Sequence, residues 1–88
     1  MKIVELEKIL QEIDVPSNAY SILKGGLPNE QLCIVKEDNI WEVYYSERGR
    51  KSSIKKFYSE EEACIYFFNK IKKYARKEIT DIEFKRLG

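Results

Sequence analysis

The chain has 88 residues, of which 43% are hydrophobic and 35% charged, and its formal net charge is +1. This length suits a single domain, residues 1–88, because it is too short to build two independent cores. One Trp, four Phe and six Tyr supply enough apolar surface to argue against a disordered chain. No apolar run approaches the roughly 18 residues of a membrane span, and the acid-containing N-terminus "MKIVELEKIL" is unlike a signal peptide. We therefore expect a cytoplasmic protein that does not enter a membrane.

The charges are unevenly distributed along the chain. Residues 1–45 contain four Lys and eight acids, whereas residues 46–58 contain five bases and only one acid, Glu47. Three Glu follow at 60–62, and residues 65–88 contain seven bases and three acids. Such separation can steer a charged partner, although solvated charge on exposed faces is the more ordinary explanation.

The N-terminal segment "KIVELEKILQEI" predicts an amphipathic helix that runs to about Glu12. Its end is marked by Val15 before Pro16, since a residue before proline favours an extended backbone. The next segment, 17–24, fits either a two-turn helix capped by Ser17 or a short strand, and we favour the helix slightly. The helical prediction for the first segment rests on apolar residues that recur at spacings of three and four: Ile3, Val4, Leu6, Ile9, Leu10 and Ile13.

The middle of the chain predicts strands. Residues 31–36 form a short apolar run rich in strand formers, and residues 37–39 are typical of a tight turn. "SSIKKFY", 52–58, predicts a third, shorter strand. Alternation in the strand between them places two sets of side chains on opposite faces: Trp41, Val43 and Tyr45 toward the core, and Glu42, Tyr44 and Ser46 away from it.

The clearest predicted helix follows the strands. Ser59 is a good N-cap, and Glu62 three residues later completes a capping-box pattern. Thr80 and Glu83 repeat that pattern, which suggests a short final helix. We therefore expect an α+β fold, in which a three-stranded antiparallel meander packs against two or more helices in the order α(α)βββα(α). The stripe that should cover the sheet consists of Ala63, Cys64, Phe67, Phe68 and Ile71.

The residue types argue against catalysis. The chain has no His, which removes the commonest general base and metal ligand, and its two Cys are too few for a zinc site. We interpret Cys33 and Cys64 as small packing groups rather than a disulfide or a reactive thiol. The "KGGLPNE" segment lacks the spacing of a phosphate-binding loop, and the acids at 60–62 are more typical of helix-dipole compensation than of a catalytic cluster. We expect no enzyme, no cofactor and no metal site.

The segment "WEVYYSERGRKSSIKKF", residues 41–57, is the best candidate for a binding surface. Gly49 supplies the backbone freedom of a hairpin turn, so a solvated turn with an optional ion pair is the simplest reading. The alternative is an interface, because Tyr and Arg are enriched at the centres of protein interfaces. The candidate partner-binding residues are Tyr44, Glu47, Arg48, Arg50 and Lys51.

Three quoted blocks, "GGLPNE", "WEVYYSERGRK" and "FYSEEEACIYFFNKI", carry a family resemblance over about residues 25–72. The pattern resembles small bacterial proteins that include immunity proteins of polymorphic-toxin systems. The resemblance implies a cytoplasmic protein that binds and blocks a cognate toxin domain, and it assigns no binding residues. The matching positions are Trp41, Val43, Tyr44, Tyr45, Ser46, Glu47, Arg48, Gly49, Phe57, Glu60, Glu62, Ala63 and Cys64.

These observations favour a protein-binding module without a cofactor. The alternative is a small nucleic-acid-binding or regulatory protein, in which the basic segment 48–56 contacts phosphates and Tyr44 stacks on a base. Against nucleic acid, the isoelectric point near 7.7 is low for a basic domain, and acids interrupt both basic segments.

Overall fold

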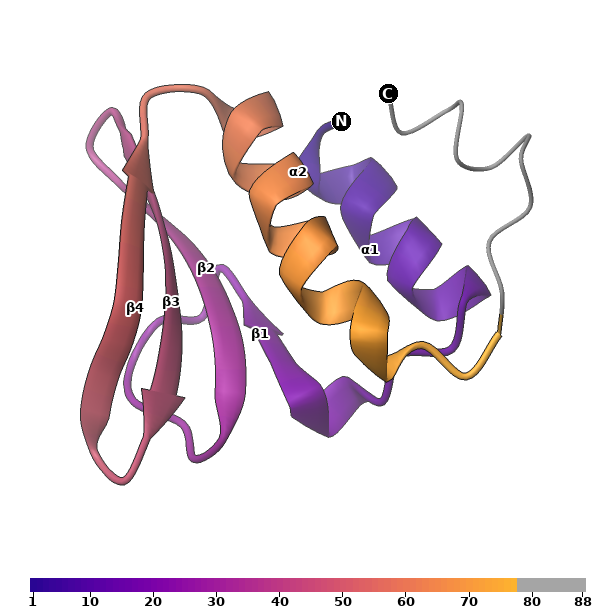
Figure 1. Cartoon of the computed structure of the whole chain (residues 1–88). Helices are drawn as coiled ribbons and strands as arrows, with labels where there is room; N and C mark the ends of the chain where they lie inside the picture. The colour runs from indigo at the N-terminus through magenta and orange to yellow at the C-terminus, as the bar shows by residue number, and fades with distance from the viewer. Residues whose placement is uncertain (78–88) are drawn as a thin grey trace.

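Two helices lie on one side of a four-stranded sheet in the computed structural model, which describes residues 1–77 (Figure 1). Helix α2 packs against β2, β3 and β4, and α1 packs against α2. The expected helix around Thr80 and Glu83 lies outside the described residues. The helical elements are α1 (Ile3–Glu12), α2 (Glu60–Ile71) and the 3-10 turns η1 (Ser17–Ala19) and η2 (Lys72–Tyr74).

The α+β class is confirmed, but the sheet is mixed and has one strand more than expected. Its order is β1-β2-β3-β4, with β1 parallel to β2 and the other neighbours antiparallel. The preference for a helix over 17–24 was wrong, because only a short 3-10 turn precedes a strand there. The strands are β1 (Tyr20–Ile22), β2 (Gln31–Glu37), β3 (Ile40–Glu47) and β4 (Arg50–Phe57).

Tertiary contacts explain why residues 20–22 form a strand. Tyr20 pairs with Leu32 of β2, and its ring meets Phe67 of α2 edge-on, with 6.4 Å between the ring centroids. These contacts link the strand to the central sheet and to the main helix at once. Local propensity over three residues is too weak a signal to compete with such packing.

The helix stripes meet the sheet in one hydrophobic cluster. All five expected residues of the α2 stripe are buried, as are Trp41 and Val43 of β3. Val4 is an exception to the α1 stripe, because it is 79% exposed and faces solvent. Both cysteines are free and buried, which agrees with their interpretation as packing groups.

The N-termini of the two helices are joined through Glu60. Ser59 caps α2 as expected, since its Oγ accepts a hydrogen bond from the Glu62 amide at 3.3 Å. Glu60 reaches the other helix, where its Oε2 accepts a hydrogen bond from the Ile3 amide at 2.8 Å. The acids at 60–62 were interpreted as helix-dipole compensation, and the structure shows that one of them, Glu60, also caps α1.

The face of the sheet away from the helices is covered in part, around Tyr44, by the connection between β1 and β2 (Figure 1). Tyr44 is 1% exposed, and its hydroxyl donates a hydrogen bond of 2.7 Å to the carbonyl oxygen of Gly26 in this connection. Cys33, the cross-strand partner of Tyr44, and Ser46 are fully buried beside it. The expectation that Tyr44 and Ser46 face solvent was therefore wrong.

Candidate binding surface at the hairpin and the adjoining groove

The turn between β3 and β4 is a tight two-residue hairpin. Arg48 and Gly49 both have positive φ, 51° and 74°, and the flanking residues Glu47 and Arg50 pair across the strands. This is the backbone pattern of the turns that match strand twist, and it confirms Gly49 as a turn residue. The Arg48 amide donates a hydrogen bond of 3.2 Å to Oδ1 of Asn29, which ties the turn to the β1–β2 connection.

The Arg48 side chain remains available at the surface. It is 89% exposed, and its Nε lies 3.9 Å from Oε1 of Glu47. An ion pair at such exposure contributes little to stability, because water screens it. The guanidinium can therefore exchange this contact for one with a partner at small cost.

The structure brings together only some of the five predicted binding residues. Glu47, Arg48 and Arg50 line a shallow hollow of about 480 Å³, which we call the hairpin hollow. Lys51 lies on the opposite face of the sheet, where its Nζ is 2.9 Å from Oε1 of Glu42 and 4.3 Å from the centroid of the Tyr44 ring. The five residues therefore do not form one surface.

Tyr44 has a structural role in this arrangement. Burial raises the pKa of Tyr44 to about 12, and the nearby Cys33 and Glu42 add to the shift. A neutral hydroxyl suits the hydrogen bond to Gly26, since the charged form would lose solvation at this buried site. Tyr44 holds the β1–β2 connection on the sheet and cannot be a surface contact.

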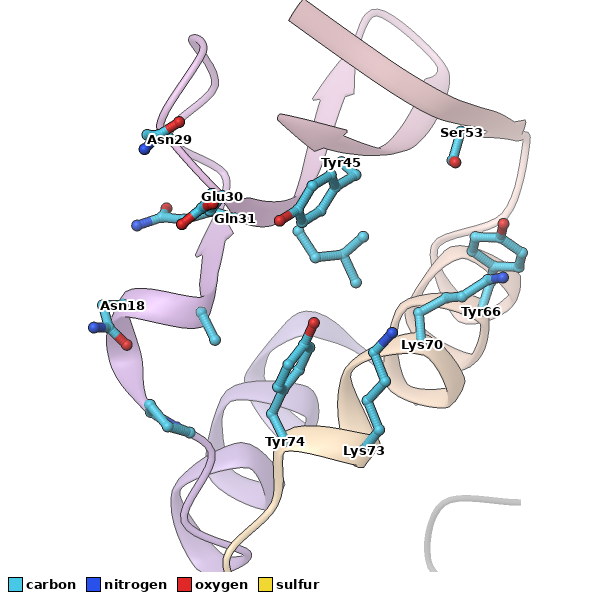
Figure 2. Close-up of a pocket in the computed structure, with 13 residues that line it drawn as sticks. Asn18, Asn29, Glu30, Gln31, Tyr45, Ser53, Tyr66, Lys70, Lys73 and Tyr74 are labelled. Carbon is cyan, nitrogen blue, oxygen red and sulfur yellow. The ribbon is translucent and has the colours of Figure 1, made fainter. Parts of the chain in front are cut away.

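A larger groove, which the sequence did not predict, lies beside the hairpin on the helix side of the sheet. Its volume is about 850 Å³, and we call it the tyrosine groove (Figure 2). Leu32 of β2 contributes an apolar lining side chain. The remaining walls include side chains from β3, α2 and η2: Tyr45, Tyr66, Lys70, Lys73 and Tyr74.

Aromatic contacts order the helical wall of this groove. The Tyr66 ring packs on Phe57 with 5.3 Å between centroids, and the Nζ of Lys70 lies 5.4 Å from the Tyr66 centroid. Lys73 lies similarly near Tyr74, at 5.3 Å. Ammonium groups near ring faces gain a modest attraction, so both lysines are held along the wall with their charges at the surface.

The strand side of the groove is more acidic. Glu30 lines it just before β2, and Glu47 lies two residues beyond Tyr45 on β3. Partial burial, then the charges of Glu47 and Glu30 and the neighbouring Tyr74, raise the pKa of Tyr45. The Tyr45 hydroxyl is therefore neutral at physiological pH and can donate a hydrogen bond to a ligand.

Tyr45 connects the two hollows. Tyr45 lines the groove, and Ser52, which pairs with it across the strands, lines the hairpin hollow. Glu47 shares a face of β3 with Tyr45, since alternate residues of a strand point the same way. Periodicity could not reveal this surface, because its residues come from segments far apart in the sequence.

The part of the chain that the structure describes contains no group of three or more His, Cys, Asp or Glu residues placed to hold a metal ion. Within residues 1–77, none of the helices has the length and apolar character needed to cross a membrane. No protein-family model matches the chain, and no curated protein or solved structure shows significant similarity to it.

Proposed function

We propose that this protein is a non-catalytic protein-binding module whose partner contacts the hairpin hollow and the tyrosine groove. The observation that carries the proposal is the exposed, backbone-anchored turn bearing Glu47, Arg48 and Arg50 next to a groove lined by three tyrosines. Arg and Tyr are, with Trp, the side chains enriched at the energetic centres of interfaces.

Preorganisation supports this choice of surface. The turn is fixed by the β3–β4 pairing and by the Asn29 hydrogen bond, so binding would order little backbone. The tyrosine side chains of the groove have few rotatable bonds, and the ring of Tyr66 is already packed against Phe57. Both features lower the entropic cost of association.

The proposed partner is a cognate toxin domain, which would make the protein an immunity protein. This step rests on the resemblance of residues 25–72 to small bacterial immunity-type proteins. A binding site without catalytic equipment agrees with a protein that acts by occupying a toxin surface. A gene for a long toxin-like protein immediately upstream would support the assignment.

The experiment is purification of the tagged protein with its partner from the native bacterium, followed by affinity measurements on variants. Arg48→Ala and Arg50→Ala should each weaken binding by about 2 kcal/mol if they are hot spots. Lys56→Ala is the matched control, because Lys56 is an exposed cation of the same strand whose pairing with Glu42 places it on the other face. Circular dichroism should show an unchanged fold for all three.

The competing surface is the acidic first half of the chain. Glu5 and Glu7 are exposed on α1, and this helix lies away from the β3–β4 turn in Figure 1. If Glu5→Ala and Glu7→Ala lose the partner while the Arg48 and Arg50 variants retain it, the β3–β4 turn does not contact the partner and the proposed surface is wrong.

Nucleic-acid binding is less well supported by the arrangement of the basic segment. Tyr44 is buried and cannot stack on a base, and Lys51 and Lys56 lie on the opposite face of the sheet from Lys55. We expect no binding to single-stranded RNA or DNA tighter than roughly the 10⁻⁴–10⁻⁶ M non-specific range at physiological salt. Tighter, salt-sensitive binding that Arg48→Ala and Arg50→Ala abolish would reverse the ranking.

A further inference from the structure

The two walls of the tyrosine groove carry charges of opposite sign. Lys70 and Lys73 project from the end of α2 and from η2, whereas Glu30 lies on the strand side (Figure 2). Among the described residues, Lys70, Lys73 and Glu30 form no ion pair with one another or with other side chains. The charges are therefore separated across the groove and available to a ligand.

An apolar patch lies between these charged walls. Leu32 and Ala19 line the groove, and both also pack against the hydrophobic cluster of the core. The hydroxyl of Tyr74 points from η2 toward the strand side in Figure 2, so a hydrogen-bonding group accompanies the apolar surface. The volume of about 850 Å³ is within the usual range of ligand sites and admits a few residues of an extended chain.

We propose that the groove binds an extended segment of the protein partner in which an apolar side chain lies between a carboxylate and a cation. The carboxylate contacts Lys70 and Lys73, the apolar side chain packs near Leu32, and the cation contacts Glu30. This inference deepens the proposed protein-binding function and rests on it.

The same charge pattern opposes a nucleic-acid strand. A phosphate backbone carries charge of one sign along its whole length. Such a strand would gain attraction at Lys70 and Lys73 and meet repulsion at Glu30 on the facing wall. A segment of mixed charge satisfies both walls, which is why we choose a protein segment as the occupant.

The test uses the full chain labelled with ¹⁵N and the synthetic peptide acetyl-Asp-Glu-Gly-Leu-Phe-Gly-Lys-Arg-amide. Two control peptides of the same length carry Asp-Glu or Lys-Arg at both ends, and octauridylate represents nucleic acid. We expect the mixed peptide to shift the amide signals of Leu32, Tyr45 and Tyr74 and to bind at least threefold more tightly than each control.

Charge variants locate the contact. Lys70→Glu combined with Lys73→Glu should weaken binding of the mixed peptide at least threefold, and the corresponding Gln variants should act in the same direction. Lys72→Glu combined with Arg76→Glu is the matched control, because both residues are exposed nearby but do not line the groove. This control should leave the affinity within about twofold of the wild type, since screening limits the effect of exposed charges outside the groove.

Several outcomes would overturn the inference. One is that the amide signals of the groove residues do not shift at about 5 mM peptide, a concentration that would largely saturate even a site with a Kd of ~1 mM. Equal binding of the mixed and single-sign peptides, or an equal effect of the two variant pairs, would also overturn it. Tighter binding of octauridylate would assign the groove to nucleic acid instead. If the purified partner still depends on Arg48 and Arg50 in any of these cases, the proposed function stands without this groove assignment.

Discussion

Glu60 is expected to stabilise both helices through one carboxylate. Its Oε2 accepts the Ile3 amide at 2.8 Å, in the first turn of α1, while the residue itself occupies the first turn of α2. A hydrogen bond from a backbone amide to a charged group contributes about 1.5–3 kcal/mol, and favourable helix-dipole contacts add about 0.3–1 kcal/mol each. The ion pair with Lys2, whose side chain is 61% exposed, spans 4.0 Å and adds little. We therefore expect Glu60→Ala to lower the free energy of unfolding by about 2–3 kcal/mol, measured by urea denaturation.

Two further variants separate the parts of this effect. Glu60→Gln keeps an acceptor for the Ile3 amide and loses the charge, so it should cost about 1 kcal/mol. Glu61→Ala removes an exposed acid from the same turn of α2 and should cost less than about 0.5 kcal/mol. If Glu60→Ala and Glu61→Ala were equally destabilising, Glu60 would be acting only on the dipole of its own helix and the proposed cap of α1 would be wrong.

Three other substitutions test the packing and the backbone. Phe67→Ala should cost about 3–5 kcal/mol, because Phe67 is fully buried in the cluster that also contains Trp41, and an unchanged denaturation midpoint would refute this packing. The pKa of Tyr44 is raised from 10.0 to about 12, so the neutral hydroxyl contributes its full stabilisation to the fold below pH 10, and this contribution is lost as pH rises toward 12. Denaturation of the wild type at several pH values should therefore show a loss of stability between pH 10 and 12. In Tyr44→Phe this loss should be smaller by at most about 3 kcal/mol. A wild-type pH profile in the Phe variant would contradict that cause. Gly49→Ala should cost about 1 kcal/mol or more by the same assay, because φ is 74° there, and no loss would mean that the turn relaxes.

The sequence predicted the elements whose signals are local. Apolar spacing and the Ser59 cap correctly gave α2, and alternation correctly assigned Trp41 and Val43 of β3 to the core. Gly49 correctly indicated the hairpin turn. Each of these signals involves residues that are close together in the sequence, within a turn or two of a helix or a few residues of a strand. A single sequence can therefore reveal them.

The features that the sequence missed depend on long-range contacts. Alternation shows that Tyr44 and Val43 point to opposite faces, but it does not show whether the second face is covered. Here the Gly26 carbonyl and its neighbouring residues cover it. The tyrosine groove is hidden for a similar reason, because Tyr45 and Tyr74 become neighbours only when η2 packs beside the sheet. Of the expected contact residues, only Tyr44 is buried in the interior. The exposed Arg48 and Arg50 remain candidates for the binding surface.

The edge of the sheet bears on why the proposed partner would use the hairpin hollow and the groove. Among the described residues, β4 is an outer strand, and it carries four cations and a register shift near Ser53, whose φ is 51°. Charged side chains and bulges are features that oppose pairing with a further strand. A second copy pairing along β4 would bring like charges together, which disfavours association through this edge. The surface left for a specific contact is the end of the sheet, where the turn holds the backbone of Arg48 and Arg50 and the tyrosine groove extends from Tyr45 to Lys70. A partner held there can use directed side-chain contacts without adding a strand.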